Sequence, residues 1–196
     1  ELVTDPIECI TEDGVRTRDG TERKIDVLIT ATGYKVFEKG NLPSFEVVGC
    51  GGLELGQFWE DQRYQAYEGT TIPNFPNYFG MLGPYALTGS SYFKMVENHS
   101  LHAVRCIKEA HKTGSTCVEI RQGPHERYFT DIQRRQQRTV FVNHSCSGSN
   151  SYYFDRHGDA PMLRPSTSVE AQWRAKHSPM SHYQFTRAEA LASTEA

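Results

Sequence analysis

The chain has 196 residues, of which 37% are hydrophobic and 23% charged, a composition typical of a globular protein. Its formal net charge is -3, and its Lys and Arg residues are scattered, so the sequence offers no basic patch for nucleic acid. No apolar run approaches the roughly 20 residues that a membrane-spanning helix needs. We therefore expect one domain, or one and a half, with neither a nucleic-acid partner nor a membrane span.

The five cysteines are odd in number, far apart in sequence and never arranged as a CxxC pair. This pattern favours a reduced chain in the cytoplasm over a disulfide framework. The cysteines are Cys9, Cys50, Cys106, Cys117 and Cys146.

The N-terminal segment predicts β structure. Asp13-Gly14 and Asp19-Gly20 are strong signals for tight hairpin turns, so residues 8–20 should form a β-meander. Residues 25–30 form an apolar run that predicts a strand buried on both faces. The run ends in Ala-Thr-Gly-Tyr at residues 31–34, which would bring small residues and a flexible glycine to a sheet edge where a large ligand could approach the backbone.

Residues 36–77 are rich in loops, with a short predicted strand at 45–48. Residues 49–54, Gly-Cys-Gly-Gly-Leu-Glu, imitate a GxGxxG phosphate-binding turn. We reject that interpretation because Glu54 places a negative charge where a pyrophosphate would bind, and because no amphipathic helix is apparent before Trp59. A β-turn that uses glycine is the simpler interpretation.

Residues 77–82 form a second apolar run, which predicts a strand ended by Gly83-Pro84. Hydroxyl residues at 88–91 are suitable N-caps for a following helix of about 20 residues that ends near Gly114. Its expected inward face consists of apolar or small residues spaced by three or four: Phe93, Val96, Ser100, Val104, Ile107 and Ala110.

The remaining chain predicts a short strand at 117–121, a helix at 126–138 and a second helix at 168–177. In the helix at 126–138, Tyr128, Phe129 and Ile132 should face inward. Residues 145–150 form a Ser/Gly loop, and the tail from Thr186 is expected to fray.

Three clusters of reactive side chains have simpler interpretations than a catalytic or metal site. His99 and His102 are spaced to share a metal, but a solvated helix face is favoured, and no metal site is predicted. Asp155, His157 and Asp159 flank a glycine and indicate a turn. His144 and Cys146 suggest a Cys-His nucleophile but lack a third partner.

Three stretches resemble a known family. The Ala-Thr-Gly-Tyr motif is similar to that of flavin-containing monooxygenases and their Baeyer-Villiger relatives. Residues 67–79, with Gly83-Pro84, resemble the GxTxPxFPNxF…GP stretch of Baeyer-Villiger monooxygenases. Residues 152–158 resemble a late segment of such enzymes, with Tyr152 where Trp is common.

The resemblance implies an α/β fold, the C-terminal portion of a Rossmann-like FAD/NAD(P)-binding flavoprotein. The β-meander comes first, and one long helix follows a turn that faces the flavin. Residues 1–35 would end the NADPH-domain insertion and return to the FAD domain, and residues 36–114 would complete that domain. Residues 115–185 would form a C-terminal extension that helps wall the substrate pocket, and residues 186–196 the frayed tail.

The resemblance also implies FAD and NADPH as cofactors. In this family NADPH reduces FAD, and a C4a-peroxyflavin formed with O2 passes one oxygen atom to a ketone or a soft heteroatom of a small organic substrate. The segment alone would be inactive, because the Ala-Thr-Gly-Tyr motif comes late in family members but already at residues 31–34 here, which implies a missing N-terminal portion. The catalytic residues would lie upstream, so none is assigned. The candidate cofactor-binding residues are Thr32, Gly33, Gly83, Pro84, Tyr85, Thr88 and Ser90.

Two alternatives remain open at this point. The chain could be a catalytically incompetent truncation that acts only as a binding module. It could also belong to a related flavin or disulfide reductase, although it lacks the CxxC or CxxxxC pair that a disulfide reductase needs.

Overall fold

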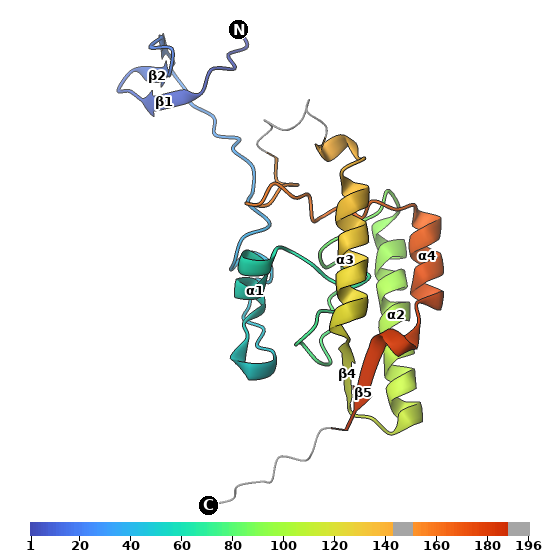
Figure 1. Cartoon of the computed structure of the whole chain (residues 1–196). Coiled ribbons are helices and arrows are strands. Elements are labelled where there is room, and N and C mark those ends of the chain that lie inside the picture. Colours follow the sequence, from blue (N-terminus) through green and yellow to red (C-terminus); the bar gives the residue numbers. More distant parts are fainter. Residues whose placement is uncertain (143–150, 188–196) are drawn as a thin grey trace, which may run out of the picture. The chain divides into compact units, whose positions relative to one another are not determined.

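The structure of the protein is a computed structural model that describes residues 1–142 and 151–187. It divides into two compact units, Glu1–Gly33 (unit 1) and Tyr34–Ala196 (unit 2). Both helices and short antiparallel strands are present, which confirms the predicted α/β class (Figure 1).

Unit 1 contains a three-stranded antiparallel sheet in the order β1-β2-β3. The strands are β1 (Ile7–Ile10), β2 (Gly14–Thr17) and β3 (Glu22–Lys24). Asp13-Gly14 leads from the first connection into β2, and Asp19-Gly20 lies between β2 and β3, so the predicted β-meander is confirmed.

The predicted strand at residues 25–30 is wrong. These residues have no regular secondary structure, and the side chains of Val27 and Ile29 are 74% and 84% exposed. A central strand needs neighbours that accept and donate its backbone hydrogen bonds. Within the described parts of the chain, the backbone of residues 26–34 forms no such bond, so the apolar run stays extended and unpaired.

Unit 2 is built from four helices, two strands and three single turns of 3-10 helix among its described residues. The helices are α1 (Leu55–Gln62), α2 (Tyr92–Thr113), α3 (Gln122–Gln136) and α4 (Ser168–His177). The strands are β4 (Cys117–Ile120) and β5 (Tyr183–Thr186). The 3-10 turns are η1 (Cys50–Gly52), η2 (Val140–Val142) and η3 (Met180–His182).

The helices predicted in the second half of the chain are confirmed. The long helix α2 ends at Gly114, whose left-handed backbone (φ 65°) lets its N–H bond the carbonyl oxygens of the last turn. Helix α3 buries Tyr128 and Ile132 and packs the partly buried Phe129 against the core, as expected. Helix α4 has the predicted bounds, and the hydroxyl of its N-cap Thr167 accepts a hydrogen bond from Glu170 N–H.

The inward face predicted for α2 is wrong at every position except Ala110. The buried residues lie on an adjoining face of the helix, which shares Ala110 with the predicted face: Met95, Asn98, His99, His102, Ala103, Cys106 and Ala110. Three of them are polar, and a pattern based on apolar spacing does not recognise such positions. The predicted face instead includes Phe93, Val104 and Ile107, which are 78%, 43% and 45% exposed.

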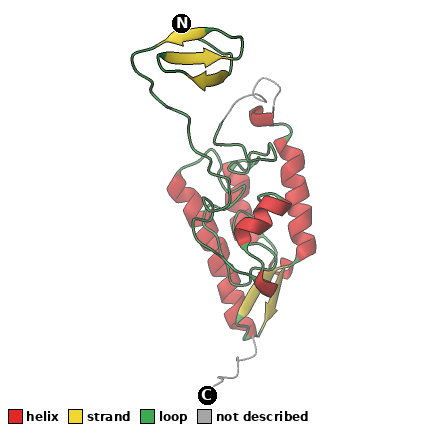
Figure 2. Ribbon diagram, turned by 90° about the vertical axis from the view of Figure 1, so that its left-hand side faces the viewer, coloured by secondary structure: helices red, strands yellow, loops and turns green. Residues whose placement is uncertain are grey.

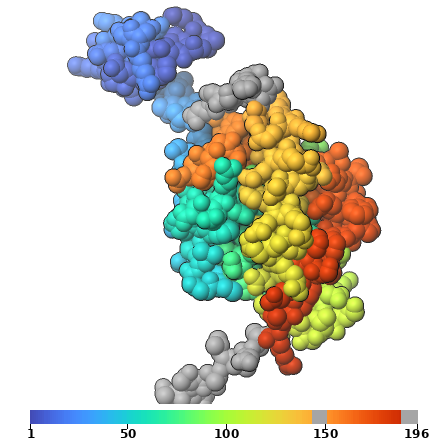
Figure 3. All heavy atoms as spheres, viewed as in Figure 1, coloured from blue at the N-terminus to red at the C-terminus, as the bar shows by residue number. Residues whose placement is uncertain are grey.

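Strands β4 and β5 pair in antiparallel fashion and lie side by side in Figure 2. They contribute Val118, Ile120 and Tyr183 to a core that also contains the buried Cys106 of α2 and Tyr128 of α3. In Figure 3 the red C-terminal residues of unit 2 lie against the yellow residues of α3. The sequence predicted β4 but not β5, of which only the last residue, Thr186, was expected to belong to the frayed tail.

A second core cluster surrounds α1, which buries Leu55 and Trp59 against Phe37, Tyr64 and Phe75. The strands predicted at 45–48 and 77–82 are absent from this region, apart from an isolated bridge at Val48. Asn77 and Leu82 both adopt a φ of 59°, in the left-handed region, which interrupts an extended strand.

Truncation of Ile120 tests the core of unit 2. Ile120 is 1% exposed, so Ile120→Ala should lower the free energy of unfolding by about 2–5 kcal/mol, measured by urea denaturation. The control is Ile107→Ala on α2, where the side chain is 45% exposed and the expected loss is below about 1 kcal/mol. Equal losses for the two variants would contradict the assigned core.

Candidate functional site

Two loops of unit 2 carry the family-like motif and fold against each other. In the first, residues 67–71 form a tight turn in which Tyr67 N–H donates to the carbonyl of Thr71 at 2.7 Å. In the second, Gly80 N–H donates to the Thr70 carbonyl at 2.7 Å, and Gly83 N–H to the Gly69 carbonyl at 3.0 Å. We call residues 67–71 and 80–91 together the turn region.

Two glycines allow the close approach of these loops. Gly69 has a φ of 71°, and a Cβ atom there would lie 2.7 Å from the Cβ of Ala86. A Cβ on Gly83 would lie 2.8 Å from the Gly69 carbonyl oxygen. Both distances are shorter than real Cβ contacts allow, so the packing of the two backbones by itself requires glycine at both positions.

A third segment, residues 161–164, holds the second loop from the other side. Tyr85 N–H donates to the Pro161 carbonyl, and Arg164 N–H donates to the Leu87 carbonyl at 2.7 Å. Pro84 and Tyr85 are fully buried as a result. The Tyr85 hydroxyl lies 3.4 Å from the side-chain oxygen of Gln136 on α3, so this ring anchors the loop inside the unit.

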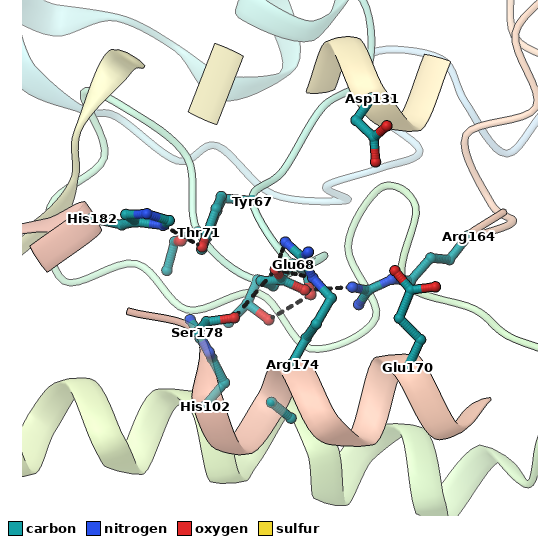
Figure 4. A network of polar contacts seen from close by, with 12 residues as sticks. Tyr67, Glu68, Thr71, His102, Asp131, Arg164, Glu170, Arg174, Ser178 and His182 are labelled. Atoms are coloured by element: carbon teal, nitrogen blue, oxygen red, sulfur yellow. Dashed lines mark hydrogen bonds and ion pairs between the residues drawn. The ribbon is translucent and has the colours of Figure 1, made fainter. Parts of the chain in front are cut away.

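The carboxylate of Glu68 is the centre of the polar network in the turn region (Figure 4). Arg164 donates to its Oε2 at 2.5 Å, and Arg174 Nε donates to its Oε1 at 2.7 Å. The Ser178 hydroxyl also donates to Oε1, at 3.3 Å. The Glu68 side chain is 3% exposed, so the three partners replace the water that the charge would otherwise bind.

The charges around Glu68 keep its carboxyl group ionised. Burial alone would raise its pKa, but the positive charge of Arg164 and the charge and hydrogen bonds of Arg174 outweigh burial, so the pKa lies below its usual value. Both guanidinium groups lie over the ring of Tyr128, at 5.7 and 5.2 Å from its centroid. Cation–π attraction thus adds to the ion pairs.

A small polar cavity of about 10 Å³ lies beside this network. Its wall includes Glu68, Thr88, His99, His102 and Arg164. The Nδ1 atom of His102 and the Nε atom of Arg164 are buried without a hydrogen-bond partner in the described structure. The volume corresponds to about one water molecule, far less than a flavin ring needs.

The prediction of a solvated histidine pair on α2 is wrong. His99 and His102 are 4% and 1% exposed. His102 Nε2 lies 2.6 Å from the Tyr183 hydroxyl, and His99 Nδ1 accepts from Leu82 N–H at 3.3 Å. The two histidines are core residues with polar partners on other segments.

The N-terminus of α2 is open, whereas that of α1 is closed. At α1 the carboxylate of Glu54 accepts hydrogen bonds from Gly56 and Gln57 N–H at 2.8 and 2.7 Å. This confirms that residues 49–54 are not a phosphate turn, although the expectation that no helix begins before Trp59 was wrong. At α2 the side chain of Ser91 forms no cap bond, and the first turn contains no acidic residue.

The predicted cofactor-binding residues divide between the two units. Thr32 and Gly33 lie in the extended, exposed end of unit 1, where nothing lies within 4 Å of a Cβ placed on Gly33. The others lie together in the turn region of unit 2: Gly83, Pro84, Tyr85, Thr88 and Ser90. Thr88 is 8% exposed and faces the polar cavity, while Ser90 is partly exposed just before α2.

Sequence reasoning missed Glu68 and its arginines. Glu68 stands inside the family-like motif, but Arg164 and Arg174 follow it by 96 and 106 positions. A buried acidic side chain within a family-like turn has no distinctive sequence signal, and no spacing rule pairs residues so far apart. The left-handed backbone conformation of Glu68, with a φ of 53°, cannot be recognised from the sequence either.

The other reactive clusters have plain outcomes. Asp155 Oδ1 accepts from the N–H groups of His157 and Asp159 at 2.8 and 2.9 Å, which confirms the predicted turn. His144 and Cys146 lie outside the described residues. Among the described cysteines, all four have free thiols. In the described parts of the chain no helix is long and apolar enough to cross a membrane.

No family model matches the sequence. The chain is nevertheless 34% identical over 179 residues to the FAD-binding monooxygenase ktnD of Aspergillus niger, covering 88% of this chain and 28% of that protein. It is 29% identical over 153 residues to a Baeyer-Villiger monooxygenase of Pseudomonas aeruginosa, covering 78% of this chain and 28% of that one. The chain thus spans about 30% of the length of the curated relatives that it matches.

Solved structures show the same fold. Cyclohexanone monooxygenase from Rhodococcus sp. Phi1, bound to NADP+, matches with a TM-score of 0.72 and 22% identity over 94% of this chain and 34% of that one. A steroid monooxygenase bound to NADP matches with a TM-score of 0.70 and 22% identity over 96% and 36%. The fold is therefore that of the corresponding part of a two-cofactor flavoprotein, as the sequence predicted.

Fold and sequence together point to one class of relatives, the flavin-dependent monooxygenases. More narrowly, the chain is similar to part of the FAD-binding monooxygenases and of the Baeyer-Villiger monooxygenases, as its sequence motifs indicated.

Neutralising Glu68 tests the buried ion cluster. Glu68→Gln leaves Arg164, only 7% exposed, without a counter-charge, so the free energy of unfolding should fall by about 3–5 kcal/mol. The control is Glu170→Gln, whose ion pair with Arg135 is about one-third exposed and contributes less than about 1 kcal/mol. Urea denaturation of both variants measures the difference, and similar losses would refute the special role of Glu68.

Three buried histidines predict acid sensitivity. Burial lowers the pKa of His99, His102 and His125 to about 4, from an ordinary value of 6.5. The unfolded chain therefore binds more protons than the folded chain between these values, so stability falls as pH drops from about 6.5 to 4. At pH 5 the loss should approach about 2 kcal/mol for each histidine.

Urea denaturation at pH 7.5 and 5.0 measures this loss. His125→Gln should reduce the difference between the two pH values, whatever its effect on stability at pH 7.5. A pH dependence that His125→Gln does not alter would contradict the assignment.

Proposed function

We propose that the chain is part of an FAD- and NADPH-dependent monooxygenase that inserts one oxygen atom of O2 into a ketone or onto a soft heteroatom of a small organic molecule. The observation that carries the proposal is the 34% identity to an FAD-binding monooxygenase over 88% of this chain. The fold supports it, because structures with this fold include complexes with FAD and NADP. Bound FAD would supply the redox and oxygen-transfer chemistry.

The open N-terminus of α2 supports the placement of the flavin. Free N–H groups and the helix dipole stabilise negative charge at such an end, and a reduced flavin carries negative charge on one edge of its ring. Helix α2 offers this end without a side-chain cap or an acidic residue in its first turn. Ser90 and the backbone at residues 91–94 would face the flavin, and Thr88 would fix the loop behind them.

Gly83, Pro84 and Tyr85 would influence flavin binding indirectly. Pro84 and Tyr85 are fully buried, and Gly83 is required by its contact with the Gly69 carbonyl. These residues would position the loop that carries Thr88 and Ser90 and exclude water behind it. A Gly83→Val substitution would therefore disturb the packing of the turn region. Any change in flavin affinity would be a consequence of that disturbance.

The remaining assignments follow from the family. Residues 1–35 would complete the NADPH-domain insertion and bring Thr32 and Gly33 back to the flavin, and residues 36–114 would complete the FAD domain. Residues 115–185 would wall the substrate pocket. The N-terminal portion of the same enzyme would hold the cofactor pyrophosphates and the catalytic residues, so this segment alone would be inactive.

A chimera tests the proposed activity. The matching 28% of the Aspergillus niger monooxygenase would be replaced by this chain, and the product assayed for bound FAD and for ketone-stimulated NADPH oxidation. We expect FAD to be retained and an oxygenated product to form, detected by mass spectrometry with 18O2. A folded chimera that binds FAD but consumes NADPH without oxygenating any ketone or sulfide would contradict the proposal.

Titration of FAD into the isolated chain tests the assignment of the pyrophosphate site to another segment. Flavin fluorescence should show no binding at micromolar concentrations, because the only described helix that follows a glycine-rich turn is closed by Glu54. Quenching with micromolar affinity would show that this segment forms a complete flavin site. It would also refute the proposed division of the enzyme.

A further inference from the structure

Helix α2 has a second apolar face, which no described residue covers completely. Its members recur at intervals of three or four: Phe93, Val96, Ser100, Val104 and Ile107. We call these five residues the α2 stripe. They lie on a different face of the helix from the polar core residues His99 and His102, which are buried.

The α2 stripe is continuous and uncharged. It extends over 14 residue steps, or about 21 Å along the helix. At 100° per residue its five side chains occupy one narrow sector, whereas the charged Glu97 and Lys108 lie at its margin. Met81, itself 44% exposed, adjoins it, because its sulfur lies 3.8 Å from the Ser100 hydroxyl.

We propose that the α2 stripe, with Met81, is the docking surface for an apolar, uncharged face of the remaining monooxygenase polypeptide. This inference rests on the proposed function, since the partner is the rest of the same enzyme. The relatives and solved structures are about three times as long as the matched region, so they contain ample chain to supply that face. The exposed side chains of Phe93, Val104 and Ile107 gather on one face of the helix, with the partly buried Val96 and Ser100 between them. Exposed apolar groups that cluster in this way mark an interaction site.

A second copy of this chain fits the stripe less well. A stable interface between separate proteins buries about 800 Å² and about 20–30 residues on each partner. The stripe and Met81 amount to six residues on one helix and one adjoining loop. Such a surface is sufficient for a contact within one folded enzyme, where the chain connection already holds the partners together, but small for an independent dimer.

The test compares one pair of substitutions in two contexts. Val104→Glu and Ile107→Glu together place two charges on the stripe, at positions that are 43% and 45% exposed in the isolated chain. In the isolated 196-residue chain we expect a change in melting temperature within about 2 °C. In the chimera with the Aspergillus niger monooxygenase the melting temperature should fall by on the order of 5 °C or more.

Val169→Glu is the matched control. Val169 is a single apolar side chain on α4, 77% exposed, and the same substitution there should be neutral in both contexts. Equal effects of the stripe substitutions in both contexts, or no effect in the chimera, would overturn the proposal. So would a dimer of the isolated chain, detected by sedimentation, that the stripe substitutions dissociate.

Failure of the docking surface and failure of the proposed function have different signatures. Melting temperature reports the contact without any turnover. A chimera that depends on the stripe but never oxygenates a substrate would refute the activity and support the docking surface. An active chimera that tolerates both substitutions would refute the docking surface alone.

Discussion

The rest of unit 2 depends on the ion pairs that the buried carboxylate of Glu68 forms. Arg164 and Arg174 reach it from two segments that lie far away in sequence, and Ser178 adds a third contact. The loop before α4, the helix itself and the residue after it are thereby tied to one tight turn. Because that turn also packs against the loop leading into α2, the position of the open α2 end depends on it.

Filling this part of the core with an ion cluster has a larger desolvation cost than filling it with apolar side chains. Removing the charges of Glu68 and its arginines from water costs several kcal/mol for each ion, and the attraction between them offsets this only with good geometry. Here the geometry is good, with short contacts on both carboxylate oxygens and both guanidinium groups over the Tyr128 ring. Apolar side chains could pack the same volume, but they would not fix the direction of approach of each segment.

Local patterns predicted the elements that local forces stabilise. The Asp-Gly turns of the β-meander, the Gly114 cap of α2 and the Thr167 cap of α4 each depend on residues within a few positions. The strand β5 was missed because its existence depends on pairing with β4, more than 60 residues earlier. Its four residues, Tyr-Gln-Phe-Thr, alternate as a strand does but are too few to specify one alone. Glu68 and its arginines were missed for the same reason of sequence distance.

The errors at residues 25–30 and on α2 have a common physical origin. An apolar run favours burial, but it does not specify the surface that will bury it. At residues 26–30 the run is exposed and its backbone unpaired, so the pattern identified the apolar residues but not a surface that buries them among the described residues.

On α2 two faces compete for the interior. The face that packs within unit 2 is the one with Asn98, His99 and His102, because those groups find hydrogen-bond partners or a polar cavity there. The regular apolar face, which dominates the sequence pattern, is left at the surface of the unit. A helix that is buried on two sides carries two patterns of inward-facing residues in its sequence. The structure is needed to show which pattern faces which neighbouring segment. The apolar face of α2 therefore corresponds to the docking surface proposed above for the rest of the enzyme. The polar residues of the helix belong to the core of unit 2 itself.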